Sequence, residues 1–209
     1  MKKIKEFDYD WINNNTSHHE YLISSVKNLL NEINLGNEKL ELLDVGCGNG
    51  YLTKTICNEF RKTLGIDLSK EGINQAEKYT NENLNFLNSD MENLISEGKK
   101  FDFISSFEVI EHQYLPDLFL KNISKLLKTD GYFLVSTPYH GYIKNLLISL
   151  LNKHDSHYNP HWRHGHIKFF SIKTFTKTLG DSGFKIIKHK FSGRFYPISS
   201  SMIFLCKKI

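Results

Sequence analysis

The sequence ELLDVGCGNGYL stands at positions 41–52 of the chain. Its first residues are apolar, as in a buried strand, and the residues that follow it resume at helical spacing. The glycines at 46, 48 and 50 lie between the two, and glycine permits a tight turn and close backbone approach because it has no Cβ. Doubly wound α/β folds bind nucleotides at such a turn, at the carboxyl end of a parallel strand. The stretch therefore predicts an α/β fold with a nucleotide-type ligand at this turn.

Strand and helix signals alternate along most of the chain. This alternation favours a parallel sheet with helices on both faces. We expect strands at 40–45, 63–66, 84–87, 101–107, 131–136, 184–191 and 201–206, and helices at 17–33, 51–61, 70–79, 115–128 and 171–182.

Acidic residues follow three successive strands and indicate the ligand. Asp44 precedes the first glycine and would be an unfavourable neighbour for a pyrophosphate, whereas Tyr51 stands where a dinucleotide fingerprint has its third glycine. Asp67 ends the second strand, where a carboxylate can accept both hydroxyls of a ribose. Asp90 follows the third strand and can accept from an adenine amine. Together these acids predict an adenosine-binding crevice that tolerates positive charge.

Four motifs resemble those of the class I S-adenosylmethionine-dependent methyltransferases. They are residues 43–50, Gly65–Ser69, Asp90-Met91 and residues 127–132, and the resemblance runs from about Leu40 to Ser136 and onward to Cys206. It implies a Rossmann-like three-layer sandwich with a seven-stranded, mostly parallel sheet and an antiparallel last strand. It also implies S-adenosylmethionine as the cofactor. The residues expected at that cofactor are Asp44, Gly46, Cys47, Gly48, Gly50, Asp67, Leu68, Asp90, Met91 and Phe107.

Two further stretches, EVIEH at 108–112 and HIKFFS at 166–171, resemble the ubiquinone-biosynthesis O-methyltransferases. In those relatives the Glu-x-x-Glu-His group is linked to a divalent ion, which would map onto Glu108, Glu111 and His112. Residues at i, i+3 and i+4 share one helical face, so the spacing allows it. However, Mg²⁺ prefers oxygen ligands and water. We therefore expect a substrate-side wall without a metal there.

Methyl transfer from a sulfonium is an in-line displacement, so the enzyme mainly aligns the acceptor and excludes water. An oxygen acceptor also gains from losing its proton, and histidine is suited to that task near neutral pH. His112, after the fourth strand, is the first candidate base, with a structural or capping role as the alternative. His140, after the fifth strand, is the second. The residues expected on the substrate side are Glu108, Glu111, Tyr139 and His166.

Residues 139–168 interrupt the α/β pattern, and long connections of this kind are often lids or binding segments. Tyr142–Leu151 predicts an apolar helix that is too short to span a membrane but can lie in its interface. Packing onto the rest of the chain as part of a lid is the alternative. A polar loop rich in histidine follows, and its irregular spacing without cysteine disfavours zinc. Trp162 and Arg163 in that loop could contact an acceptor or simply pack at the surface.

The chain has 209 residues and a net charge of +4, which suits one domain at 1–209. Its three cysteines are widely spaced and odd in number, so we expect no disulfides and a reducing, cytoplasmic location. Residues 168–209 carry nine Lys/Arg and one acid. Such a basic segment can attract an anionic ligand, a membrane surface or nucleic acid, or can be a solvated face.

These features predict an S-adenosylmethionine-dependent methyltransferase that methylates an oxygen of a small molecule. The expected acceptor is a phenolic or polyprenylated compound, or else a sugar or glycan precursor. Peripheral membrane contact is a further hypothesis, whereas the oligomeric state is not predicted. The alternatives are a non-catalytic S-adenosylmethionine-binding module and an RNA methyltransferase. We expect no nucleic-acid partner, because the chain has no Asn-Pro-Pro-Tyr-type motif and no separate RNA-binding module.

Overall fold

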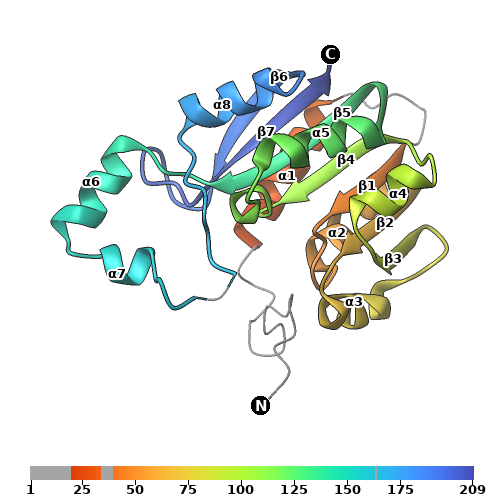
Figure 1. The fold of residues 1–209 in the computed structure, drawn as a ribbon, viewed down its shortest axis with the longest axis horizontal. Helices are drawn as coiled ribbons and strands as arrows, with labels where there is room; N and C mark the ends of the chain where they lie inside the picture. The colour runs from red at the N-terminus through yellow and green to blue at the C-terminus, as the bar shows by residue number, and fades with distance from the viewer. Residues whose placement is uncertain (1–19, 34–39, 163) are drawn as a thin grey trace.

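The structure, a computed structural model, describes residues 20–33, 40–162 and 164–209. Its centre is a seven-stranded sheet with the strand order β3-β2-β1-β4-β5-β7-β6 (Figure 1). Neighbouring strands from β3 to β5 are parallel, whereas β7 is antiparallel to both β5 and β6. The strands are β1 (Glu41–Val45), β2 (Lys62–Asp67), β3 (Leu84–Asn88), β4 (Phe101–Phe107), β5 (Leu127–Pro138), β6 (Phe184–Ser192) and β7 (Ser201–Lys208). The predicted sheet, with its antiparallel last strand, is confirmed.

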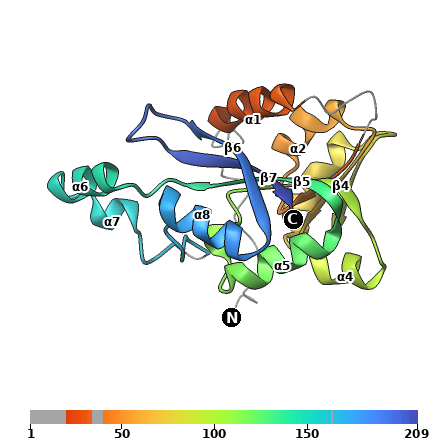
Figure 2. The ribbon, with the colours of Figure 1, turned by 90° about the horizontal axis from the view of Figure 1, so that it is seen from above.

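Helices cover both faces of the sheet (Figure 2). The α-helices are α1 (Glu20–Glu32), α2 (Tyr51–Ile56), α3 (Lys70–Ala76), α4 (Met91–Ser96), α5 (Pro116–Leu126), α6 (Tyr142–Leu150), α7 (His154–His157) and α8 (Ile172–Asp181). Short 3-10 turns are η2 (Cys57–Glu59), η3 (Glu77–Tyr79) and η4 (Ile110–His112). Helices α1 and α2 lie on one face and α4, α5 and α8 on the other, while α6 and α7 lie beyond the end of the sheet. The three-layer arrangement predicted from the sequence is present.

The core has one part on each face of the sheet. Phe103 of β4 packs toward α1, in a cluster with Leu29, whereas the next residue, Ile104, packs toward α5 with Leu120. Burying a side chain such as Phe103 contributes about 1.5–3 kcal/mol. A strand that is buried on both faces has a continuous run of apolar residues, so such strands can be predicted from the sequence.

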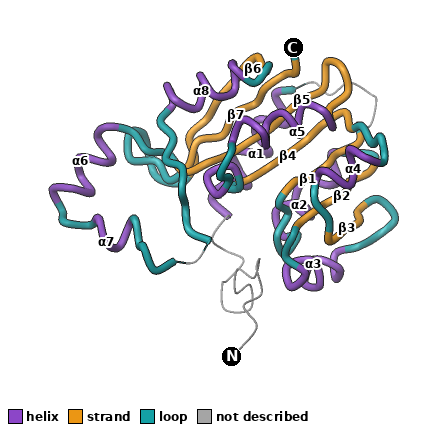
Figure 3. The backbone as a smooth tube through the Cα atoms, in the orientation of Figure 1, coloured by secondary structure: helices purple, strands orange, loops and turns teal. Residues whose placement is uncertain are grey.

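Several elements differ from the sequence-based expectation. Helix α5 ends at Leu126, and β5 begins at Leu127 instead of Gly131, because Leu127 already pairs with Phe101 of β4. Helix α4 was not predicted, since it has only six residues and buries only Leu94. Helix α7 interrupts the segment expected to be a histidine-rich loop. Figure 3 shows that the connection from β5 to α8 consists of two helices joined by loops.

The N-terminal helix α1 packs mainly against the sheet. The expected helix began at residue 17, and residues 17–19 lie outside the described residues. The body of α1 buries Leu22, Val26 and Leu29 against the face of the sheet. Its first residue also meets the start of α2, where Tyr51 Oη donates to Glu20 Oε1 at 3.4 Å. Helix α1 therefore builds the core more than it covers the crevice.

Candidate functional site

The turn between β1 and α2 has the backbone conformation that its glycines predict. Gly46, Gly48 and Gly50 have φ angles of 77°, 53° and 73°, in the left-handed region that favours glycine. The N–H of Gly46 donates to Ile66 O at 2.8 Å, which fixes the turn against β2. A Cβ atom on Gly46 would lie 2.4 Å from Val109 Cγ2. The glycine turn therefore lies directly against the segment that follows β4.

Asp67 ties this turn to the end of β2. Its Oδ2 accepts from the Gly48 N–H at 2.8 Å, and its Oδ1 accepts from the Ser69 N–H at 2.7 Å. Burial raises the pKa of the carboxyl. A carboxylate has about four lone-pair sites, so each oxygen can accept one more hydrogen bond. The carboxylate thus lies at the predicted edge, and its contact with a ribose stays a prediction.

Asp44 and Asp90 have local structural partners. Asp44 is 2% exposed, and its two oxygens accept from Thr53 Oγ1 at 2.5 Å and from Ser105 Oγ at 2.7 Å. Burial raises its pKa to about 6. Asp90 caps α4, where its Oδ1 accepts from the Asn93 N–H at 2.8 Å. Asp44 thus supports the turn from beneath, and its contact with a cofactor stays a prediction.

The other residues expected at the cofactor differ in exposure. Leu68 is 48% exposed beside Asp67, so its side chain is available to a ligand. Cys47 is a buried free thiol that lies close to Gly65. Met91 is partly buried against the core. Phe107 is 6% exposed and packs in the α1-side core, so its side chain contributes mainly to stability.

Glu108 is held in place by hydroxyl groups from two strands. Ser136 Oγ of β5 donates to its Oε1 at 2.6 Å, and Ser201 Oγ of β7 donates to its Oε2 at 3.0 Å. Its φ angle of 55° is in the left-handed region, where a side chain is strained. Burial raises its pKa to about 7. The segment after β4 therefore turns sharply, with Glu108 facing β5 and β7.

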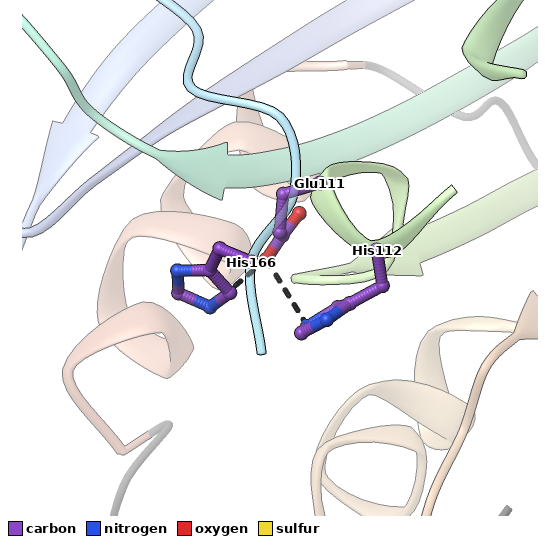
Figure 4. Close-up of side chains that lie close together, drawn as sticks. All are labelled: Glu111, His112 and His166. Carbon is purple, nitrogen blue, oxygen red and sulfur yellow. Dashed lines mark ion pairs between the residues drawn. The ribbon is translucent and has the colours of Figure 1, made fainter. Parts of the chain in front are cut away.

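Glu111, His112 and His166 come together at this turn (Figure 4). Glu111 is fully buried, and its Oε1 lies 3.9 Å from Nε2 of His112 and 3.9 Å from Nε2 of His166. The Glu111 carbonyl accepts from the N–H groups of Ile167 and Lys168 at 3.0 and 2.9 Å, which holds the His166 segment in place. Burial raises the pKa of Glu111 and lowers that of His166 to about 4.

Among the described residues, the group of side chains that could hold a metal ion is Glu111, His112 and His166. This group differs from the set that the resemblance implies. The implied set was Glu108, Glu111 and His112, but Glu108 is absent from the group and His166 is in its place. The reason is conformational, because Ile110–His112 forms a 3-10 turn with Glu108 outside it, instead of an α-helical face. Sequence spacing could not reveal His166, which lies 55 residues after Glu111 and reaches it through main-chain hydrogen bonds.

His140 and Tyr139 lie in an aromatic cluster that joins the 139–168 segment to the sheet. His140 is 6% exposed, and its ring centroid lies 5.0 Å from Phe169 and 5.9 Å from Tyr158. Burial lowers the pKa of His140 to about 4, so its ring is neutral and a weak base. Tyr139 packs against Phe191 at 5.1 Å. Both residues fit packing roles better than contact with an acceptor.

Trp162 forms part of the wall around the cluster. Its ring centroid lies 5.1 Å from that of His166 and 6.3 Å from that of His112, and its side chain is 51% exposed. Arg163, the other residue that we expected to meet an acceptor, lies outside the described residues. An aromatic ring beside a buried carboxylate and two imidazoles suits an acceptor with a flat apolar part and a hydroxyl.

Comparisons with known proteins agree with this geometry. Residues 16–189 match a family model described as a methyltransferase domain. The "Ubiquinone biosynthesis O-methyltransferase" of Rickettsia canadensis (strain McKiel) is 27% identical over 199 residues, which cover 89% of this chain and 82% of that protein. The protein of the same name from Pelagibacter ubique (strain HTCC1062) is 35% identical over 103 residues, 48% of this chain and 42% of that protein. The second match spans less than half of that relative.

A solved structure shows the same fold. The magnesium protoporphyrin IX methyltransferase from Synechocystis PCC 6803, with bound SAH, superposes with a TM-score of 0.67 at 19% identity, covering 91% of this chain and 83% of that one. Its strands and helices match the three-layer arrangement, and the family model covers most of the chain, including the glycine turn and Asp67. The chain therefore belongs to the class I methyltransferase domain family, whose members use S-adenosylmethionine as cofactor.

Proposed function

We propose that the chain transfers a methyl group from S-adenosylmethionine to an oxygen atom of a small molecule. The observation that carries this proposal is the cluster of Glu111, His112 and His166. The cluster lies beside the cofactor turn, because Val109, in the same segment as Glu111 and His112, lies against Gly46. A sulfonium needs little chemical help to release its methyl group, whereas a hydroxyl acceptor needs its proton removed. Imidazole nitrogens and a carboxylate are the groups suited to hold and deprotonate that hydroxyl. The relatives are named as O-methyltransferases, which supports the same assignment.

The acceptor that we propose is a phenolic compound that carries an apolar chain. The Trp162 ring offers a flat apolar surface next to the cluster, which suits a phenol better than a sugar. The relatives are named for ubiquinone biosynthesis, which points to the same chemical class. A sugar hydroxyl is the alternative acceptor, and S-adenosylmethionine binding without catalysis is the alternative function, since a fold alone does not give an activity.

Methyl-labelled S-adenosylmethionine and a panel of acceptors test this function. The panel contains phenols and catechols with and without an isoprenoid chain, nucleotide sugars, and RNA. We expect label in an O-methyl group of the phenols, with faster transfer when the apolar chain is present. Label in RNA or only in sugars would contradict the proposed acceptor. Cofactor binding without transfer to any acceptor would contradict the enzymatic role.

We also propose that helix α6 and the β6–β7 loop contact a lipid surface. Lys144 Nζ donates to the carbonyls of Ser199 and Ser200, which ties α6 to that loop. Large apolar side chains are exposed along the joined surface, namely Tyr142, Ile143, Leu150, Leu151, Phe195 and Tyr196. No helix among the described residues is long and apolar enough to cross a bilayer. A short amphipathic segment can still insert its apolar side chains at the membrane interface.

Vesicle flotation tests the lipid contact. We expect the chain to float with vesicles that contain anionic lipid. The driving force is the burial of exposed apolar side chains, which contributes about 0.8 kcal/mol for each CH₂ group. The double variant Leu150→Ser, Leu151→Ser should stay at the bottom of the gradient. The control variant Leu118→Ser changes a leucine that is also exposed, but on α5. Equal flotation of the double variant and the control would contradict the proposed surface.

A further inference from the structure

We propose that Tyr21 of helix α1 is a positioning residue for methyl transfer, because its hydroxyl holds the Glu108 carboxylate through Ser201. Glu108 stands directly before the segment that forms the turn η4, which carries Glu111 and His112. The inference rests on the proposed function, in which those two residues meet the acceptor. It adds a residue of the N-terminal helix to the acceptor side, although no spacing in the sequence links this helix to η4.

A continuous chain of hydrogen bonds joins α1 to Glu108. Tyr21 Oη lies 2.8 Å from Ser201 Oγ on β7, and Ser201 Oγ donates to Glu108 Oε2 at 3.0 Å. A serine hydroxyl has a single proton to donate. Because Ser201 gives that proton to the carboxylate, Tyr21 is the donor in the first bond. The chain is therefore directed from α1 toward Glu108.

The surroundings of Tyr21 keep its hydroxyl protonated, as a donor must be. The side chain is partly buried and packs against the α1-side core. Burial raises the pKa of Tyr21 well above its ordinary value, and the nearby charges of Glu108 and Glu111 raise it further. The hydroxyl thus remains a donor to Ser201 over the whole pH range in which the protein is folded and active.

The first turn of α1 is itself fixed to the sheet. Ser192 Oγ of β6 donates to the main-chain carbonyl of Tyr21, and Ser25 Oγ donates to Ser192 Oγ at 3.0 Å. The next residue, Leu22, is 0% exposed in the core. Tyr21 is therefore anchored at its main chain as well as at its ring, so its hydroxyl is a fixed support for the residues beyond it.

Glu108 is a residue that needs such support. Its φ angle of 55° is strained for a residue with a side chain, and strained conformations persist only where the surrounding contacts hold them. Ser136 Oγ of β5 donates to Glu108 Oε1 at 2.6 Å and accepts from the Glu108 N–H at 3.1 Å. Ser136 thus holds one carboxylate oxygen, while Tyr21 and Ser201 hold the other.

The position of Glu108 decides where η4 begins. Among the described residues, no side chain caps the start of this turn, so the main chain at Glu108 sets its direction. That direction in turn places Glu111 and His112 beside the acceptor. A displacement of about 1 Å in such groups can lower a rate by about 10²-fold. The hydroxyl chain from α1 therefore acts on the rate of methyl transfer and not on the cofactor turn.

The variants Tyr21→Phe and Ser201→Ala test this chain. Tyr21→Phe removes only the hydroxyl and keeps the ring in the core. We expect each variant to lower the turnover number by about 3- to 10-fold, with wild-type affinity for S-adenosylmethionine. The double variant should lose no more than Ser201→Ala alone, because Tyr21 acts through Ser201. The matched control Tyr132→Phe removes a tyrosine hydroxyl of β5 beside the same core and should turn over as the wild type does. Melting curves establish that each variant is folded.

Amide hydrogen exchange reports on the turn without any acceptor. We expect residues 108–113 to exchange about 3- to 10-fold faster in Tyr21→Phe and in Ser201→Ala, and at wild-type rates in Tyr132→Phe. Wild-type turnover by Tyr21→Phe, wild-type exchange of this segment in Tyr21→Phe, or additive losses in the double variant would each overturn the proposal. Faster exchange of the segment in both variants, together with no methyl transfer to any acceptor by the wild type, would uphold the chain and contradict the proposed function instead.

Discussion

His112→Ala should lower the turnover number by about 10²- to 10⁴-fold and leave the affinity for S-adenosylmethionine unchanged. His112 lies after β4 with Nε2 beside Glu111, on the side of the glycine turn where an acceptor must approach. Its ring does not hold the turn itself, which is fixed by Gly46, Asp67 and their partners on β2. Loss of the imidazole should therefore affect the reacting hydroxyl and not the cofactor.

Steady-state kinetics with a phenolic acceptor and calorimetry with S-adenosylmethionine measure the two effects separately. The control is His154→Ala, which removes a histidine of α7 whose Nε2 lies 2.9 Å from Ser149 Oγ. We expect wild-type turnover from this control. Unchanged turnover in His112→Ala would reduce His112 to a structural residue. An equal loss of cofactor affinity would mean that the change had disturbed the turn.

Asp67→Ala should weaken S-adenosylmethionine binding by about 1–3 kcal/mol, or about 5- to 150-fold. Two causes add in this variant. The ribose loses its charged hydrogen-bond acceptor, and the N–H groups of Gly48 and Ser69 lose the carboxylate that holds the turn in shape. Asp67→Asn retains one acceptor oxygen and should fall between the wild type and Asp67→Ala.

Calorimetric titration measures the affinity of each Asp67 variant. Asp181→Ala is the matched control, because Asp181 is an exposed acid on α8 that pairs with Lys177 on its own helix. We expect wild-type affinity from the control. If Asp67→Ala bound the cofactor as tightly as Asp181→Ala does, Asp67 would have no role at the ribose.

The sequence predicted the sheet and the cofactor turn well because their signals are local. Strands buried on both faces give continuous apolar runs, and the turn requires glycine at 46, 48 and 50. Asp67 is the last residue of β2 and so falls at the same edge as Gly46 in any parallel arrangement of these strands. Helix α4 was not predicted, because its six residues with a single buried leucine show no clear helical period.

The acceptor side was predicted less well because its contacts join distant parts of the chain. Glu111 meets His166 through main-chain hydrogen bonds to residues 167 and 168, and no spacing in the sequence encodes that meeting. Glu108 was expected to face the substrate, yet serines from β5 and β7 hold it. Asp44 was expected at the cofactor, yet hydroxyls of Thr53 and Ser105 enclose it beneath the turn. These partners come from distant parts of the chain, so the local sequence does not reveal them, and the contacts of these residues with substrate and cofactor stay predictions.

The central claim is that the edge between Asp67 and the Glu111 cluster holds S-adenosylmethionine beside an acceptor. A crystal structure with S-adenosylhomocysteine bound tests this most directly. We predict that the product lies on the Gly46–Gly50 turn, with its ribose hydroxyls on the Asp67 carboxylate and its sulfur toward Glu111, His112 and His166. Product bound elsewhere, or with its sulfur directed away from those three residues, would contradict the account.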